Sequence, residues 1–246
     1  MKVYLKYRIN KFDTFFMSKR FSIIVAGGSG SRMNNLTPKQ FLLLDNKPIL
    51  IHTLEKFLAI KNNKILLILP LEYIQFWENI KMNYGKKIAE IQVIAGGKTR
   101  FQSVKNGLNA INEEIGLVAI HDAVRPLIEV EKINEAFELS KIKPAVVLAV
   151  DAKDSVRIVT EENVNKAIDR KSVKLIQTPQ VFNLGFLKKA YLQQELDWFT
   201  DDASVIENDG VMITLLEGHY SNIKITTPED LILAKILLKE SPETKS

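Results

Sequence analysis

The sequence predicts a single α/β domain with a mostly parallel, Rossmann-like sheet, plus a protruding β-hairpin arm at about residues 153–176. Between Ser22 and Val150, short runs of nearly continuous apolar residues alternate with stretches of helical spacing. This alternation is typical of parallel strands covered by helices on both faces. After Val150 the alternation stops and a polar segment rich in β-branched residues begins. The alternation resumes near Gly185. A chain of 246 residues is long enough for one such domain with a full core.

The strand and helix candidates follow each other along the chain. Short apolar runs bounded by turn residues predict the strands, and longer stretches of helical spacing predict the helices. The expected strands are Ser22–Ala26, Lys64–Leu69, Ile91–Ala95, Leu117–His121, Ala145–Val150, Val211–Leu215 and Ile223–Thr226. The expected helices are Pro48–Leu58, Leu71–Tyr84, a stretch after Gly97 to about Asn112, Glu131–Lys141, Gly185–Gln194, Asp202–Glu207 and a last one from Pro228. Ligands of open parallel sheets bind at the carboxyl ends of the strands, so the loops that follow these strands should form one site.

The arm is expected between Lys153 and about Lys174, with the tip of its hairpin near Glu161–Asn163. A two-stranded hairpin of this length has no core of its own. An arm that packs on a second subunit would explain it, and a surface hairpin on a monomer would also fit.

Charge and composition exclude several classes of protein. The net charge is +5, and residues 1–20 alone account for it, because they hold six lysines and arginines against one aspartate. The balanced remainder argues against a domain-wide basic face for nucleic acid. The longest apolar run, Ile65–Leu71, is far too short to span a membrane. The absence of cysteine excludes disulfides, thiolate catalysis and cysteine-based zinc sites, and it fits a reducing cytoplasm.

Residues 1–20 are expected to be an extension of the folded domain, which we assign to residues 21–246. They have no continuous apolar stretch and no small-residue cleavage site, so they do not look like a secretory signal. Their basic and aromatic residues could form a targeting or surface arm; we favour a disordered extension or a start assigned too early, with Met17 as the true start.

The first strand ends in the loop Ala26–Arg32, which reads Ala-Gly-Gly-Ser-Gly-Ser-Arg and is followed by Pro38-Lys39-Gln40. Three glycines in four positions let backbone N–H groups approach an anion closely, and Arg32 and Lys39 add positive charge. No Gly-Lys-Ser/Thr ends the loop, and Met33 stands where the dinucleotide fingerprint requires its third glycine. The loop therefore predicts binding of a phosphate tail, against the alternative of a structural turn with solvent-facing basic residues.

Two later loops carry further candidates. Gly96–Ser103 also follows a strand with two glycines, and it could form a wall for a base and ribose or be a simple turn. His121–Pro126 places Asp122 at a strand's carboxyl end, where a carboxylate beside a triphosphate can hold Mg²⁺. His121 is expected to be a packed structural histidine rather than a base. The chain has no Asp-x-Asp, which argues against a typical metal-dependent sugar transferase.

The second half of the chain adds a lysine and two helix starts. Lys224 lies on a predicted strand and can reach a phosphate at the sheet edge, or it can be a surface lysine. Thr200–Ser204 is expected to be a helix start with a structural role. Thr227 and Pro228 predict the cap and first position of the last helix.

Together these segments resemble the 2-C-methyl-D-erythritol 4-phosphate cytidylyltransferase family, which uses CTP in the non-mevalonate isoprenoid pathway. The resemblance runs from about Phe21 to Leu238, with the motifs in the family's order. Its strongest motifs are Ala26–Arg32 with Pro38-Lys39-Gln40, His121–Pro126, Gln177–Gln180, Thr200–Ser204 and Asn222–Asp230. The resemblance implies a nucleotidyltransferase domain that transfers CMP from CTP to 2-C-methyl-D-erythritol 4-phosphate.

The resemblance also implies a role for each matching residue. Those implied to be catalytic are Arg32 and Lys39, at the α-phosphate, and Arg170 and Lys224, at the acceptor's phosphate. Those implied to bind the nucleotide are Ala26, Gly27, Gly28, Ser29, Gly30, Gly97, Lys98, Ser103 and Ala123. Those implied to contact the acceptor are Arg125, Ser155 and Thr178, and Asp122 is implied to bind Mg²⁺.

The partners implied are CTP and a polyol phosphate, with no nucleic acid and no membrane, in a cytoplasmic homodimer. In the family the arm is exchanged between subunits, so Ser155 and Arg170 would serve the partner's site. Two positions depart from the family's pattern: Val124 stands where alanine is frequent, and Ser155 where threonine is usual. Valine at that position is typical of the related ribitol 5-phosphate cytidylyltransferases, which remain an alternative, as does a non-catalytic nucleotide-binding protein.

Overall fold

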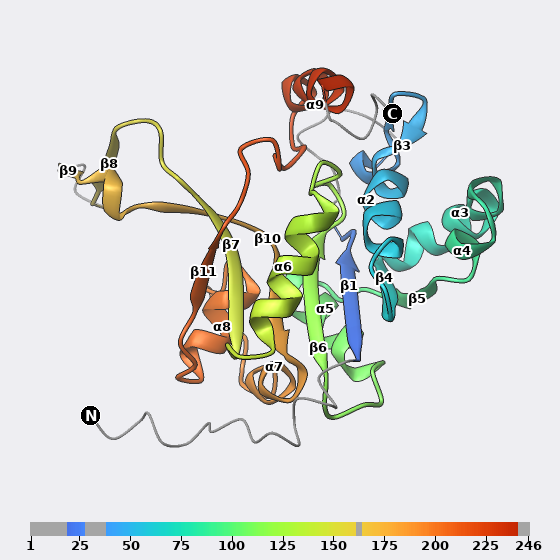
Figure 1. Cartoon of the computed structure of the whole chain (residues 1–246), viewed down its shortest axis with the longest axis horizontal. Helices are drawn as coiled ribbons and strands as arrows, with labels where there is room; N and C mark the ends of the chain where they lie inside the picture. The colour runs from blue at the N-terminus through green and yellow to red at the C-terminus, as the bar shows by residue number, and fades with distance from the viewer. Residues whose placement is uncertain (1–18, 28–37, 161–163, 241–246) are drawn as a thin grey trace.

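A computed structural model of the chain describes residues 19–27, 38–160 and 164–240, and within them it confirms the predicted α/β class. A seven-stranded sheet has the order β11-β7-β10-β6-β1-β4-β5 (Figure 1). Its strands are β1 (Arg20–Val25), β4 (Asn63–Leu69), β5 (Gln92–Ala95), β6 (Leu117–Asp122), β7 (Ala145–Asp151), β10 (Lys174–Asn183) and β11 (Thr214–Glu217). All pairs are parallel except those of β10, which runs antiparallel to both β6 and β7.

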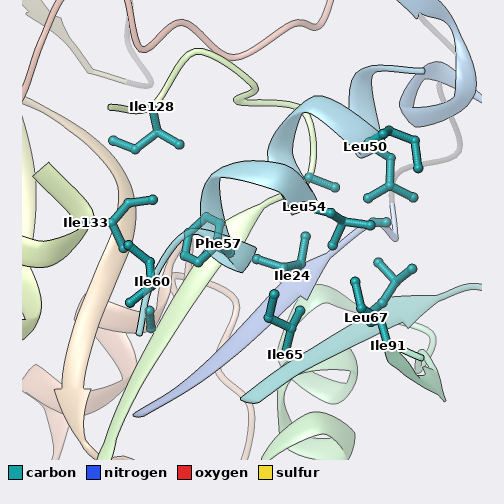
Figure 2. Packing of buried hydrophobic residues seen from close by; sticks show 14 of the residues in the cluster. Ile24, Leu50, Leu54, Phe57, Ile60, Ile65, Leu67, Ile91, Ile128 and Ile133 are labelled. Carbon is teal, nitrogen blue, oxygen red and sulfur yellow. The ribbon is translucent and has the colours of Figure 1, made fainter. Parts of the chain in front are cut away.

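Helices cover both faces of the sheet because the buried strands are apolar on both sides. On β1, Ile24 packs with Leu54 and Phe57 on one face, while Ile23 packs with Val104 on the other. Figure 2 shows the first of these clusters, in which α2 lies over β1 and β4. The first face carries α2 (Ile49–Leu58), α3 (Leu71–Ile80), α4 (Lys86–Ala89) and α6 (Val130–Ser140). The second carries α5 (Arg100–Asn109), α7 (Leu184–Ala190) and α8 (Asp202–Asn208).

Further elements lie near the edge of the sheet where the parallel strands end. They are η2 (Lys39–Phe41), the two-stranded β2 (Leu43–Leu44) and β3 (Lys47–Pro48), and the last helix α9 (Pro228–Glu240). A third cluster links β2 to α9, in which Leu44 and Ile49 pack with Ile225 and Ala234. Thr227 Oγ1 accepts a hydrogen bond from the N–H of Asp230 at 3.3 Å, as expected of the cap of this helix. Among the described residues, no helix is both long enough and apolar enough to cross a membrane.

One strand was missed, one expected strand lies outside the sheet, and the expected strand Val211–Leu215 begins only at Thr214, as β11. Lys174–Asn183 forms β10, an interior strand of the sheet, although its first three residues are exposed, which made the segment look like part of the arm. Its pairing with β7 shifts between Ile176 and Gln180, so the strand has no regular pattern to detect. Conversely, Ile223–Thr226 is an extended segment outside the sheet, held to the neighbouring loop by a hydrogen bond of 2.9 Å from the N–H of Ile225 to the carbonyl of Val124.

The predicted arm is present. It consists of β8 (Val156–Val159) and β9 (Asn165–Ile168), paired antiparallel, followed by η4 (Arg170–Ser172). It projects away from the body of the molecule, at the upper left of Figure 1. The expected tip at 161–163 lies outside the described residues, as do residues 1–18 of the predicted extension.

Candidate active site

A cleft of about 210 Å³ lies where β1, β5 and β6 end. The loops that follow these strands form its walls, together with η2 and the extended segment before α9. Its lining residues are Val25, Ala26, Gly27, Lys39, Gln40, Gly97, Lys98, Thr99, Arg100, Ser103, Asp122, Val124 and Lys224. These three loops therefore converge, as the parallel sheet predicted, whereas the chain after β7 leads into the arm.

The first wall is the end of β1. The N–H of Ala26 continues the sheet to the carbonyl of Ile68 at 2.9 Å, and the carbonyl of Ala26 accepts a hydrogen bond from Gln40 Nε2 at 3.0 Å. Gln40 is 1% exposed, and its buried Oε1 has no hydrogen-bond partner among the described residues. Lys39, the residue before it, also lines the cleft. Four predicted site residues of this loop lie outside the described residues: Gly28, Ser29, Gly30 and Arg32.

The second wall is the loop before α5, where Thr99 caps the helix through a 3.1 Å hydrogen bond from the N–H of Gln102. A Cβ at Gly97 would collide with Cβ of Gln102, so only glycine fits there. The N–H of Gly97 donates to Ser103 Oγ at 3.0 Å, and that of Lys98 donates to Gln102 Oε1 at 3.1 Å. The loop is thus fixed by its own helix.

Asp122 lies at the centre of the cleft, with three cations around its carboxylate. Lys224 Nζ is 2.9 Å from Oδ2, Arg125 Nε is 3.7 Å from Oδ2, and Arg100 Nε is 3.8 Å from Oδ1. Burial alone would raise the pKa of Asp122, but Arg100, Lys224 and Arg125 outweigh it and hold the pKa well below its usual range. The carboxylate is therefore ionised at neutral pH.

His121, on the other side of the same strand, is a structural histidine, as the sequence predicted. It is fully buried, and its ring nitrogens lie 3.1 Å from Thr178 Oγ1 and 3.1 Å from the carbonyl of Arg125. Burial lowers its pKa to about 3, so the ring is neutral at pH 7. Thr178 Oγ1 also accepts a hydrogen bond from the N–H of Asp122 at 3.1 Å. Thr178, which was predicted to contact the acceptor substrate, therefore lies beneath the carboxylate rather than in the lining of the cleft.

Two further predicted residues stand next to the cleft without lining it. Ala123 begins the turn after β6, and its carbonyl accepts a hydrogen bond from Thr53 Oγ1 at 2.8 Å. Arg125 donates from Nη1 to the carbonyl of Asn222 at 2.7 Å, which ties the loop after β6 to the segment that carries Lys224. Burial lowers the pKa of Arg125.

Ser155 and Arg170 lie on the arm, and the structure does not bring them to this cleft. Ser155 is exposed, and Arg170 donates to the carbonyl of Lys153 at 2.9 Å. Arg170 instead lines a hollow at the base of the arm with Asp151, Ala152, Lys153, Lys171 and Lys174.

Sequence reasoning missed Arg100 and Asp202 as a pair. Arg100 Nη2 lies 2.6 Å from Asp202 Oδ2, although 102 positions separate the two residues. Thr200–Ser204 does begin a helix as expected, with Asp201 and Ser204 forming a capping box at the start of α8. An acidic helix start carries no signal for a distant arginine, so this contact could not be inferred from the sequence.

Comparison with known proteins gives consistent results. The family model described as 2-C-methyl-D-erythritol 4-phosphate cytidylyltransferase matches residues 21–240. The enzyme of that name from Bacteroides fragilis is 46% identical over 220 residues, covering 89% of this chain and 99% of its own. That from Porphyromonas gingivalis is 43% identical over 221 residues, covering 89% and 98%.

Solved structures agree with these sequence matches. The 4-diphosphocytidyl-2C-methyl-D-erythritol synthase of Anaerococcus prevotii superposes with a TM-score of 0.79 at 29% identity, covering 94% of this chain and all of its own. The 2-C-methyl-D-erythritol 4-phosphate cytidylyltransferase of Francisella tularensis gives 0.71 at 34% identity, covering 89% and 99%.

Proposed function

The chain belongs to the 2-C-methyl-D-erythritol 4-phosphate cytidylyltransferase family, and we propose that its cleft transfers CMP from CTP to 2-C-methyl-D-erythritol 4-phosphate. The products are 4-diphosphocytidyl-2-C-methyl-D-erythritol and pyrophosphate, for isoprenoid precursor synthesis. One observation carries the proposal: the loops after β1 and β5, which begin with glycines, meet Lys39, Asp122 and Lys224 in a single cleft.

In the proposed reaction, an oxygen of the acceptor's phosphate attacks the α-phosphorus of CTP in line and pyrophosphate leaves. The nucleophile is already an anion, so the reaction needs no general base, and the neutral, enclosed His121 is not required to act as one. What opposes the reaction is repulsion between two polyanions. Lys39, with Arg32 from outside the described residues, would stabilise the charge that builds up at the α-phosphate.

Asp122 would supply one carboxylate ligand to a magnesium ion that is held mainly by the phosphates of the substrate. Among the described residues no group of three or more His, Cys, Asp or Glu side chains could form a closed metal site. Mg²⁺ in nucleotide enzymes typically takes one or two carboxylates and completes its shell with phosphate oxygens and water. The ionised Asp122 meets that need, and the ion would neutralise charge on the triphosphate.

We propose that Ala26, Gly27, Gly97, Lys98 and Ser103 hold the nucleotide. Ala26 and Gly27 directly follow β1, and the other three belong to the loop fixed by α5. The loop's own hydrogen bonds hold it rigid, and a preformed wall of this kind suits the recognition of a base and ribose. Gly28, Ser29, Gly30 and Ala123 complete this assignment on the family resemblance.

The acceptor's phosphate would be held by Lys224 from one subunit and by Arg170, with Ser155, from the arm of its partner. We therefore propose a homodimer, and the surface of the arm supports it. Five apolar side chains on or next to the arm are between 41% and 61% exposed: Ile158, Val159, Val164, Leu175 and Ile176. Apolar residues gathered on a projecting segment favour contact with another protein surface.

The remaining assignments are part of the same proposal. Arg125 and Thr178 would support the acceptor side through the segment that they brace, and residues 21–246 would be the catalytic domain preceded by an extension at 1–20. A cytoplasmic location fits the cysteine-free sequence.

The test is release of pyrophosphate from CTP, with 2-C-methyl-D-erythritol 4-phosphate and ribitol 5-phosphate supplied in parallel. We expect turnover with the first acceptor and little with the second. Val124 lines the cleft, and valine at this position favours the hypothesis that ribitol 5-phosphate is the acceptor. Val124→Ala therefore serves as the matched variant. A clear preference for ribitol 5-phosphate would contradict the proposed acceptor but not the reaction type. Saturable CTP binding without turnover would contradict the proposal that the protein is an enzyme.

A further inference from the structure

Arg100 is the first residue of α5 and joins two carboxylates that belong to different parts of the fold. Its Nη2 lies 2.6 Å from Asp202 Oδ2, at the start of α8, and its Nε lies 3.8 Å from Asp122 Oδ1, at the end of β6. We refer to this chain of contacts, Asp202–Arg100–Asp122, as the carboxylate bridge. It runs from the interior of the protein to the centre of the cleft.

The inner end of the bridge is rigid. Asp202 is fully buried, and its Oδ1 accepts a hydrogen bond of 2.6 Å from the hydroxyl of Tyr191. Tyr191 is 2% exposed, and its ring stacks on Phe101, the neighbour of Arg100, at 4.6 Å between centroids. A buried carboxylate is strongly destabilising without a cationic partner, so Asp202 requires Arg100 where it stands. Burial opposes the charge on Arg100, but Asp202 outweighs it and raises the pKa of the guanidinium.

The outer end of the bridge acts on Asp122 from one side only. Lys224 and Arg125 approach Oδ2, at 2.9 Å and 3.7 Å, whereas Arg100 approaches Oδ1. In the proposed reaction Lys224 binds the acceptor's phosphate and must leave Asp122. Arg100 cannot leave in the same way, because Asp202 holds its other nitrogen.

We propose that Arg100 is a positioning residue that keeps the carboxylate of Asp122 oriented for the metal–nucleotide complex, and that Asp202 fixes Arg100 for this purpose. The inference rests on the proposed function. Arg100 and Asp202 have opposite charges, so the pair adds orientation to the cleft rather than net positive charge. Lysine cannot replace Arg100, because it has a single nitrogen and cannot span both carboxylates.

The test uses Arg100→Lys and Asp202→Asn in the full chain, with Arg20→Lys as the matched control. Arg20 also pairs with a carboxylate, Glu138 at 2.6 Å, but it lies at the opposite end of β1 from the cleft. Calorimetry without acceptor measures how CTP binding depends on Mg²⁺ concentration, and steady-state kinetics separate kcat from KM. Loss of a partner of a metal-binding group typically costs about 10–100-fold in metal affinity.

We expect Arg100→Lys to raise the Mg²⁺ concentration for half-maximal CTP binding by about tenfold or more, with kcat at saturating Mg²⁺ within a few-fold of wild type. Asp202→Asn should shift the same measurement in the same direction, and Arg20→Lys should leave it unchanged. Circular dichroism and thermal unfolding establish that each variant is folded. If Arg100→Lys does not fold, Asp202→Asn and Tyr191→Phe, which removes the hydroxyl bonded to Asp202, decide the question.

Two results would overturn the inference. Wild-type Mg²⁺ dependence in folded Arg100→Lys or Asp202→Asn shows that the bridge does not orient Asp122. Normal Mg²⁺ dependence with a large fall in kcat shows that Arg100 acts on the reacting phosphates instead. Failure of the proposed function is distinguishable from both, because then the wild-type protein itself releases no pyrophosphate.

Discussion

The cleft and the arm hold their charged side chains in opposite ways. In the cleft, Asp122 is almost enclosed and three cations surround it within 3.8 Å. On the arm, Arg170 is exposed and donates to a backbone carbonyl, and the apolar side chains of the hairpin face outward. Under the proposed assignments, the nucleotide half of the site would be preorganised by the subunit's own fold, whereas the acceptor half would depend on the arm of a partner subunit.

The largest effect is expected from a substitution in the nucleotide half of the proposed site. Lys39→Ala removes the cation that we propose stabilises the α-phosphate, and loss of one such group typically costs about a hundredfold or more in kcat. Steady-state kinetics with both substrates measure it. The exposed Lys86, which pairs with Glu90 far from the cleft, provides the control Lys86→Ala. A Lys39→Ala enzyme with wild-type kcat would contradict the assignment.

The second effect should appear only on the acceptor side. Arg170→Ala should lower kcat/KM for the acceptor by about ten- to a hundredfold, since a hydrogen bond to a charged group contributes about 1.5–3 kcal/mol. CTP binding in the absence of acceptor should be unchanged. The neighbouring Lys171→Ala is the control, and equal losses for both variants would show that only the general charge of the arm matters.

The third prediction concerns how the stability of the folded protein depends on pH, which reports on the burial of His121 next to the cleft. His121 has a pKa of about 3 in the folded protein against 6.5 for the ordinary side chain, so below pH 6.5 the unfolded state binds a proton that the folded state refuses. Stability is fully present above pH 6.5 and should fall by up to about 1.4 kcal/mol per pH unit as the pH approaches 3. Burial also lowers the pKa of His52, which acts in the same direction. Urea denaturation at several pH values measures the slope, and His121→Asn should flatten it; an unchanged slope would mean that His121 takes up its proton in the folded state.

The smallest expected effect tests the exposed surface of the arm. Ile158 is 56% exposed, so Ile158→Glu should leave the folding of the subunit intact while placing a charge in the proposed dimer contact. We expect dimer dissociation to become about tenfold easier, which corresponds to about 1.4 kcal/mol. Sedimentation measures it, with Leu192→Glu, 78% exposed on the main body, as control. A protein that is monomeric before the substitution would refute the dimer.

The sequence predicted the parts of the fold in which local pattern and tertiary role agree. Strands such as β6 and β7 are buried on both faces, so their apolar runs were visible, and the glycine-ended loops marked the cleft. β10 was missed because its first residues are exposed and its register is interrupted, although it is an interior strand of the sheet. Ile223–Thr226 has strand composition, but it packs Ile225 into the cluster under α9 instead of joining the sheet.

The candidate site divides in the same way. Asp122 and Lys224 could be predicted because each follows or occupies a strand-like run at the expected edge, and they do meet at 2.9 Å. The contact between Arg100 and Asp202 depends on how α5 and α8 pack on one face of the sheet, which no local pattern records. The role proposed for Arg170 rests on the family resemblance alone, since its contacts within one subunit give no indication of a substrate.

The antiparallel course of β10 has a consequence for how the arm is attached. Asp151, the last residue of β7, is the register partner of Lys174, the first residue of β10, and their side chains form an ion pair. The arm therefore leaves and re-enters the sheet between adjacent antiparallel neighbours, a gap that a tight turn of two to five residues can bridge. The arm is thus a modular insertion: excision of about residues 153–173 and closure by such a turn should leave the sheet and the nucleotide cleft intact as a minimal single-subunit domain.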